Sequence, residues 1–228
     1  SIIINLAVLV FFKYYGFLLN TIGGIIGIHI PHPELSLPIG LSFYTFRNLS
    51  YLFDIYLSKV SAQRNFLTFA VYSTMFPYTS AGPIVRYTDI ETQLKQRTIN
   101  ISKFGIGAEL FVKGLAKKVL LADNLSVLYS SICGHPQMSV FTSWLGILAY
   151  TMQLYFDFSG YSDMAIGLGK MLGFDFNKNF DYPYISTSVS EFWRRWHISL
   201  GSWFRDYIYI PLGGNRVSTL KHIRNILV

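Results

Sequence analysis

The sequence predicts an all-α membrane protein, a polytopic bundle of helices with re-entrant or interfacial segments. Its 228 residues are 51% hydrophobic and only 14% charged, whereas a typical soluble domain has about 25% charged residues. The apolar residues also come in long runs, several of which approach the roughly 20 residues that a helix needs to cross a bilayer. We find no long repeat and no low-complexity linker, so residues 1–228 are treated as one domain.

The charges favour a lipid bilayer over nucleic acid as a partner. Lys and Arg number 19 against 12 Asp and Glu, for a net charge of +7. The basic residues lie between the apolar runs and form no separate arm, so we expect them to face anionic headgroups and the cytoplasm. We expect no nucleic-acid partner. Cys133 is the single cysteine, which excludes an intrachain disulfide.

The first apolar run, residues 1–19, is long enough to cross a bilayer. It continues into the glycine-rich stretch 21–30, where we expect a bend or a second short segment. No charged segment and no cleavage site precede the run, so it does not resemble a signal peptide. The chain begins without Met, and a new apolar run starts at Ile226 just before its end, so we expect an internal fragment truncated at both ends.

The second predicted span covers residues 37–57 and carries Pro38 in its first turn, where proline is tolerated. Arg47 and Asp54 interrupt this span and, seven residues apart, share one face of a helix. Buried charges in a membrane protein are costly, and they are usually paired or functional. We expect a structural pairing inside the bundle at these two positions.

The middle of the chain combines backbone breaks with further helices. Prolines and a glycine in segment 77–83 predict a re-entrant turn or an interfacial loop, and the basic segment 86–103 is expected on the cytoplasmic side. Residues 104–132 are expected to form a helix that starts at the interface and enters the bilayer. Residues 140–156 are a cleaner span, and the glycine-rich stretch 157–173 favours close helix packing.

The candidate chemistry lies in the tract SVSEFWRRWHISLGSWFRDYIYIPLGGNR, residues 188–216. Ser188 and Glu191 have the spacing of a capping box, so a helix is expected to begin there and to stop at Pro211. Steps of 100° along that helix place His197 on a broad aromatic face. Arginines mixed with aromatic rings are typical of the membrane–water interface.

His197 is the candidate catalytic residue, because an imidazole titrates near physiological pH and can take the proton of an acceptor hydroxyl. Neighbouring cations could stabilise the charge that develops on a carbonyl oxygen, or bind the phosphates of an acyl donor. From spacing alone, a single histidine on an aromatic face is more often a packing residue. No metal site is expected, and the tentative substrate-binding or donor-binding residues are Arg194, Arg195, Trp196 and Arg205.

Four tracts resemble the membrane-bound O-acyltransferase family, and in particular its branch for O-acetylation of bacterial alginate. They are LPIGLSFYTF (37–46), MFPYTSAGPIVRY (75–87), QLYFDFSGYSDMAIGLG (153–169) and EFWRRWHISLGSWFRDYIYIPLGGNR (191–216). The tracts follow the family's order, and the last two are long and specific. The resemblance implies a many-helix membrane fold around a tunnel in which an acyl donor and an acceptor hydroxyl meet.

The resemblance also implies a pair of key histidines. His197 matches the first, and the second belongs to a later tract, commonly Leu-Trp-His-Gly, that this sequence does not contain. In the family the later histidine is the stronger candidate for the general base, so His197 would orient a substrate or a partner, or stabilise charge. We therefore expect this chain alone to be inactive.

The activity expected from the resemblance is acetyl transfer to hydroxyls of an exported, alginate-like polysaccharide, with acetyl-coenzyme A as a candidate donor and no bound cofactor. The expected location is the bacterial inner membrane, as a multi-pass protein with periplasmic acetyltransferase partner proteins. One alternative is a sister enzyme that moves D-alanine to teichoic acid or acetylates peptidoglycan or cellulose. Another is a non-enzymatic channel or transporter, motivated by Arg47, Asp54 and Asp157.

Overall fold

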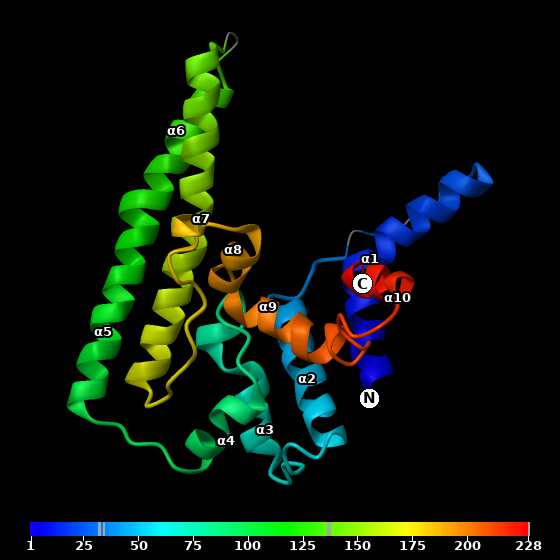
Figure 1. Cartoon of the computed structure of the whole chain (residues 1–228), viewed down its shortest axis with the longest axis vertical. Coiled ribbons are helices and arrows are strands. Elements are labelled where there is room, and N and C mark those ends of the chain that lie inside the picture. Colours follow the sequence, from blue (N-terminus) through cyan, green and yellow to red (C-terminus); the bar gives the residue numbers. More distant parts are fainter. Residues whose placement is uncertain (32, 34, 136–137, 228) are drawn as a thin grey trace.

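The computed structural model describes residues 1–31, 33, 35–135 and 138–227, and within these ranges its regular elements are all helical (Figure 1). The all-α class is thus confirmed. The α-helices are α1 (Ile2–Ile26), α2 (Leu41–Tyr56), α3 (Phe66–Thr74), α4 (Tyr87–Lys95), α5 (Ile101–Ala116), α6 (Asp123–Cys133), α7 (Val140–Met171), α8 (Val189–Arg195), α9 (Ile198–Phe204) and α10 (Thr219–Leu227). The shorter segments are the 3-10 helices η1 (Phe76–Tyr78) and η3 (Pro183–Ile185) and the π-helices η2 (Lys117–Ala122) and η4 (Arg205–Tyr209).

Helix α1 is longer than the sequence indicates. It continues through the glycine-rich stretch to Ile26 and ends at Gly27, whose left-handed backbone (φ 72°) is a common helix terminator. Within the predicted stretch 21–30 the chain therefore turns at Gly27, and no second segment begins at the earlier glycines, because single glycines inside a helix cost only about 1 kcal/mol each. Within the described residues, α1 is the one helix that is both long and apolar enough to cross a membrane.

Helix α2 starts later than predicted, because a tight turn precedes it. Gly40 has a left-handed backbone (φ 73°), and a Cβ atom there would lie 2.1 Å from the carbonyl oxygen of Thr79. Only glycine allows so close a backbone approach at this φ. The helix therefore begins at Leu41, and Pro38 lies before it instead of in its first turn.

Helices α5 and α7 pack antiparallel, forming the long pair at the left of Figure 1. Gly107 faces Gly167 and Gly114 faces Gly160, so closely that a Cβ atom on any of them would lie 2.5 to 2.7 Å from the facing glycine's oxygen. Small residues that let backbones touch are typical of helix pairs in membranes. The predicted close packing of stretch 157–173 is confirmed, and α7 continues into this stretch without a break as far as Met171.

The segments α5, η2 and α6 run along one side of α7 and form with it the α5–α7 hairpin. Ion pairs add to the contact between the two sides of this hairpin. Lys117 Nζ lies 2.6 Å from a carboxylate oxygen of Asp163, and Lys118 Nζ lies 2.8 Å from one of Asp157. Each lysine comes from η2 and each aspartate from α7. Asp157 and Asp163 are thus both engaged in ion pairs within the protein.

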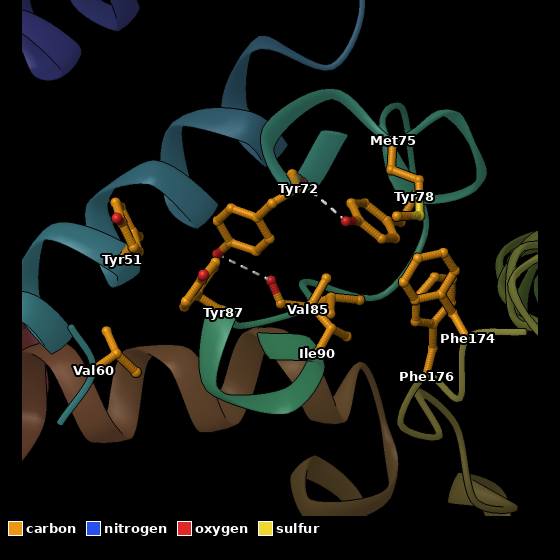
Figure 2. Close-up of a cluster of buried hydrophobic side chains, with 10 residues drawn as sticks. All are labelled: Tyr51, Val60, Tyr72, Met75, Tyr78, Val85, Tyr87, Ile90, Phe174 and Phe176. Carbon is orange, nitrogen blue, oxygen red and sulfur yellow. Dashed lines mark hydrogen bonds between the residues drawn. The ribbon is translucent and has the colours of Figure 1, made fainter. Parts of the chain in front are cut away.

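Helix α2 lies at the centre of the other half of the fold. One face packs against α3 and α4 in a tyrosine-rich core, which Figure 2 shows. There the hydroxyl of Tyr78 donates to the carbonyl of Tyr72 (2.9 Å), and the hydroxyl of Tyr72 donates to the carbonyl of Val85 (3.4 Å). A second face of α2 packs against Trp203 and Tyr207 from α9 and η4. The candidate tract is therefore anchored on α2.

The two charged residues of α2 are fully buried and are held by other elements. Arg47 donates to the carbonyl oxygens of Tyr78 (2.7 Å) and Ser73 (2.9 Å). Asp54 accepts a hydrogen bond of 2.7 Å from the hydroxyl of Tyr207. Both charges are thus held structurally inside the protein, as predicted, but by other elements and not by each other, and these contacts join α2 to two distant parts of the chain.

Candidate functional site

The helix predicted over the candidate tract is interrupted at its histidine. Helix α8 ends at Arg195, Trp196 is extended (φ −99°, ψ 126°), and His197 is left-handed (φ 44°, ψ 54°) before α9 begins. A continuous helix over this tract is therefore wrong, and a face drawn at 100° steps does not extend across the break. A left-handed backbone is uncommon outside glycine, and such outliers cluster at active sites and ligand clamps.

A second segment of the chain accounts for the break. The N–H of Ile198 donates to the carbonyl oxygen of Asn179 (2.9 Å), and the N–H of Asp181 donates to the carbonyl oxygen of Arg195 (2.9 Å). A continuous helix would use the same backbone groups for its own i to i−4 hydrogen bonds. Because the second segment takes them, His197 lies at a corner between two short helices.

Helix α8 begins where the sequence predicts. Ser188 Oγ accepts the N–H of Glu191 (3.1 Å), which is the N-cap half of a capping box. The Glu191 carboxylate accepts the N–H of Thr187 (3.0 Å), one residue before the standard position. The same carboxylate binds Nε (3.0 Å) and Nη2 (2.8 Å) of Arg195. Arg195, a tentative donor-binding residue, is thus held in an ion pair within α8.

The imidazole of His197 is mostly enclosed by aromatic rings. Phe158 meets it edge-on, with ring centroids 4.7 Å apart, and Phe180 faces it at 6.4 Å. Burial lowers the pKa of His197 to about 4, because a desolvated imidazolium is disfavoured. The ring is therefore neutral at physiological pH, and one of its nitrogens has a lone pair that can accept a proton or a hydrogen bond.

Polar contacts link His197 to two segments that lie far from it in the chain. Its Nδ1 lies 3.1 Å from Oδ1 of Asn179. Ser199 Oγ donates to the same Oδ1 (2.8 Å) and accepts the N–H of Ile84 (3.0 Å). Ile84 belongs to the tract 75–87, so two of the four family-like tracts meet beside the histidine.

Sequence reasoning missed Asn179, Ser199 and Ile84 as neighbours of His197. Ser199 is two residues from the histidine, which is a weak local signal. Asn179 sits in an aromatic loop and Ile84 in an apolar tract, and neither position differs visibly from ordinary packing residues. Only the tertiary contacts identify them.

Trp196 packs into an aromatic cluster. Its ring stacks on Phe192 (centroids 5.6 Å apart, 16° between planes) and meets Phe180 edge-on at 5.1 Å. A third contact joins it to Tyr155 of α7 at 6.2 Å. Since Phe180 also faces His197, this cluster supports the corner, and a direct binding role for Trp196 stays a prediction.

Arg194 and Arg205 are exposed and line one cavity of about 950 Å³, together with Trp193 and Tyr209. The guanidinium of Arg205 is partly engaged by Asp206, at 2.7 Å. The structure thus brings Arg194 and Arg205 together. The other two tentative binding residues are engaged elsewhere, Trp196 in aromatic packing and Arg195 in an ion pair. Donor binding at this cavity stays a prediction.

Comparisons with known proteins agree on one family. The model of the membrane-bound O-acyltransferase family matches residues 40–228. The whole chain is 47% identical to the probable alginate O-acetylase of Pseudomonas aeruginosa, covering 45% of that protein. It is 35% identical to the peptidoglycan O-acetyltransferase of Helicobacter pylori, covering 49% of that protein. The identity to the teichoic acid D-alanyltransferase of Bacillus subtilis is 30%, over 80% of this chain and 47% of that protein.

The chain spans about half the length of the curated relatives it matches. The family model nevertheless covers most of the chain, including every element that surrounds His197. Its helical architecture and apolar composition agree with the membrane location that the family's description states. This chain belongs to the membrane-bound O-acyltransferase family.

Proposed function

We propose that the protein is an O-acetyltransferase of the bacterial inner membrane that acetylates hydroxyls of an exported, alginate-like polysaccharide. The observation that carries the proposal is His197, a neutral, mostly enclosed imidazole on a left-handed corner within the family's tract. A conformation of this kind costs roughly 1–3 kcal/mol and persists where the surrounding structure enforces it. Such a residue is a stronger candidate for chemistry than a histidine on a regular helix face.

The identities favour an alginate-like acceptor over the alternatives. Four probable alginate O-acetylases match essentially the whole chain at 46–47% identity. The peptidoglycan and teichoic acid enzymes match at 35% and 30%. The sister activities are therefore the second choice.

Acetyl transfer requires an acceptor hydroxyl held against an activated carbonyl carbon. In the proposal, a neighbouring hydroxyl of the same polysaccharide donates a hydrogen bond to the unprotonated ring nitrogen of His197, which orients the acceptor hydroxyl while its oxygen attacks that carbon. With acetyl-coenzyme A as donor, a carbon–oxygen bond forms and the carbon–sulfur bond breaks. The hydroxyl proton passes to a base and ends on the released thiol. The resemblance implies that the family's second histidine is this base, while Arg194 and Arg205 would bind donor phosphates.

The outer surface of the α5–α7 hairpin supports a multi-pass arrangement. Large apolar side chains are 55–68% exposed along both of its sides, among them Leu120, Val127, Trp144 and Ile147. Many exposed large apolar side chains along one hairpin are typical of contact with lipid or with another chain. We place the hairpin in the bilayer and the polysaccharide and its partner proteins on the periplasmic side.

The channel or transporter alternative receives no support from the charges that motivated it. Arg47 binds two backbone carbonyls, Asp54 binds Tyr207, and Asp157 pairs with Lys118. Each charge is therefore accounted for by a contact within the protein.

The experiment that tests the proposal replaces His197 in the chromosomal copy of the gene. We expect His197→Ala to abolish acetyl esters on the exported polymer while its abundance in the membrane stays at the wild-type level. His29→Ala is the matched control, since His29 is exposed and lies in the loop after α1, outside the tract. Wild-type acetylation in the His197→Ala strain would reject the proposed site, and loss of an ester from a different polymer would assign a sister activity.

A further inference from the structure

We infer that Asn179 is a positioning residue that fixes the tautomer and the orientation of the His197 imidazole. The inference deepens the proposed function and rests on it. Asn179 thereby decides which ring nitrogen of His197 faces the polysaccharide.

The direction of the Asn179 amide follows from its neighbours. The side-chain atom assigned as Oδ1 lies 3.2 Å from the backbone nitrogen of Ser199 and 2.8 Å from its hydroxyl. A backbone N–H can only donate, so the amide atom that faces it must be the oxygen. An amide turned the other way would direct its own N–H groups at this donor.

The tautomer of His197 follows from that direction. Oδ1 of Asn179 accepts and cannot donate, and it lies 3.1 Å from Nδ1 of His197. In a neutral imidazole one nitrogen carries the hydrogen and the other a lone pair. Nδ1 is therefore the protonated nitrogen, and Nε2 has the lone pair. This is the nitrogen that would accept the hydrogen bond of the polysaccharide hydroxyl.

The contact is built to hold one geometry. Asn179 is 1% exposed, and its carbonyl oxygen also accepts the N–H of Ile198, so side chain and backbone both bind the histidine corner. Phe158 and Phe180 meet the imidazole on two sides and restrict its rotation. A histidine oriented through its other nitrogen is the arrangement used where an imidazole must present one nitrogen to a reacting group.

A purely structural role is the competing explanation. Oδ1 of Asn179 accepts the N–H of Ser199 in the first turn of α9, so the residue also acts as a helix cap supplied by another segment. A cap alone predicts that its removal lowers the amount of folded protein. A positioning role predicts that catalysis falls while folded protein remains.

The test uses variants expressed from the chromosomal gene. Asn179→Leu removes the acceptor, and we expect acetyl esters on the polymer to fall roughly tenfold or more, the scale on which partners that orient a histidine act, at wild-type membrane abundance. Asn179→Asp keeps an acceptor oxygen, and we expect it to restore at least half of the acetylation. Asn124→Leu is the control, because Asn124 is exposed on α6. Wild-type acetylation in Asn179→Leu, or no rescue by Asn179→Asp, would overturn the inference.

A measurement on the unaltered protein keeps the inference testable if Asn179→Leu fails to accumulate. Nitrogen NMR of ¹⁵N-histidine-labelled protein, purified in detergent and assigned with His197→Gln, reports the tautomer directly. We expect Nδ1 of His197 to be protonated and Nε2 to be unprotonated at neutral pH. The opposite tautomer, or an imidazolium, would overturn it. If His197→Ala retains acetylation, the proposed function fails; if only Asn179→Leu retains it, the inference alone fails.

Discussion

Oδ1 of Asn179 lies 3.1 Å from Nδ1 of His197, although 18 residues separate the two in the chain. The same asparagine accepts the N–H of Ile198 on its carbonyl oxygen and the N–H of Ser199 on its side chain. Three consecutive residues are thus held by one buried side chain and its backbone. This contact sets both the left-handed corner and the ring orientation.

The left-handed corner predicts a difference between two substitutions of His197. Asn adopts positive φ readily, whereas a β-branched residue there is a genuine outlier. We expect His197→Asn to stay folded and His197→Val to lose about 1–2 kcal/mol of stability, with acetyl transfer lost in both. Thermal unfolding of the detergent-solubilised proteins checks this. Equal melting temperatures for the two variants would show that the corner is not strained.

Burial of His197 predicts a pH dependence of stability. Its pKa falls from an ordinary value near 6.5 to about 4 in the folded protein, so the unfolded chain binds the proton first as the pH falls. The free energy of unfolding is therefore highest above pH 6.5, where the imidazole is neutral in both the folded and the unfolded chain. It decreases as the pH falls toward 4.

Between pH 7 and pH 5 this loss amounts to at most about 2 kcal/mol. We expect the melting temperature of the wild type to fall more steeply over this interval than that of His197→Gln, which lacks the titrating group. Parallel pH profiles for the two proteins would contradict the assignment.

The glycine contacts of the α5–α7 hairpin predict a position-dependent effect of adding a methyl group. In Gly114→Ala the new Cβ would lie 2.5 Å from the backbone oxygen of Gly160, and overpacking of this kind costs roughly 1–3 kcal/mol. Gly105→Ala on the same helix meets nothing within 4 Å, so it should stabilise by up to about 1 kcal/mol. Membrane abundance and unfolding midpoints measure both. A Gly114→Ala protein as stable as Gly105→Ala would argue against direct backbone contact.

The buried hydrogen bond between Tyr207 and Asp54 links η4 to α2 at 2.7 Å. Tyr207→Phe removes the donor and leaves a carboxylate oxygen of a fully buried residue without it, which should cost about 1–3 kcal/mol. Tyr56→Phe is the control. Tyr56 lies on α2, the helix of Asp54, and is 82% exposed, so this substitution should change stability little. Denaturant unfolding in detergent compares the two. If both substitutions are neutral, the contact does not hold the tract on α2.

The sequence by itself determined the features that depend on local patterns. Long apolar runs predicted an all-helical membrane chain, the spacing of Ser188 and Glu191 predicted the start of α8, and glycines in stretch 157–173 predicted close packing. These hold because helix caps, helix periodicity and small-residue contacts are encoded within a few residues of one another. The family resemblance came from tracts of the same local kind.

Only the tertiary structure decided how the site is built. The periodicity of residues 191–211 favours one helix, yet the backbone of Asn179 and Asp181 takes hydrogen-bonding groups that this helix would need. The helix therefore breaks, and His197 moves from a regular face to a strained corner. This outcome depends on which distant segment forms hydrogen bonds with the backbone of the tract in the folded protein, and no local sequence pattern contains that information.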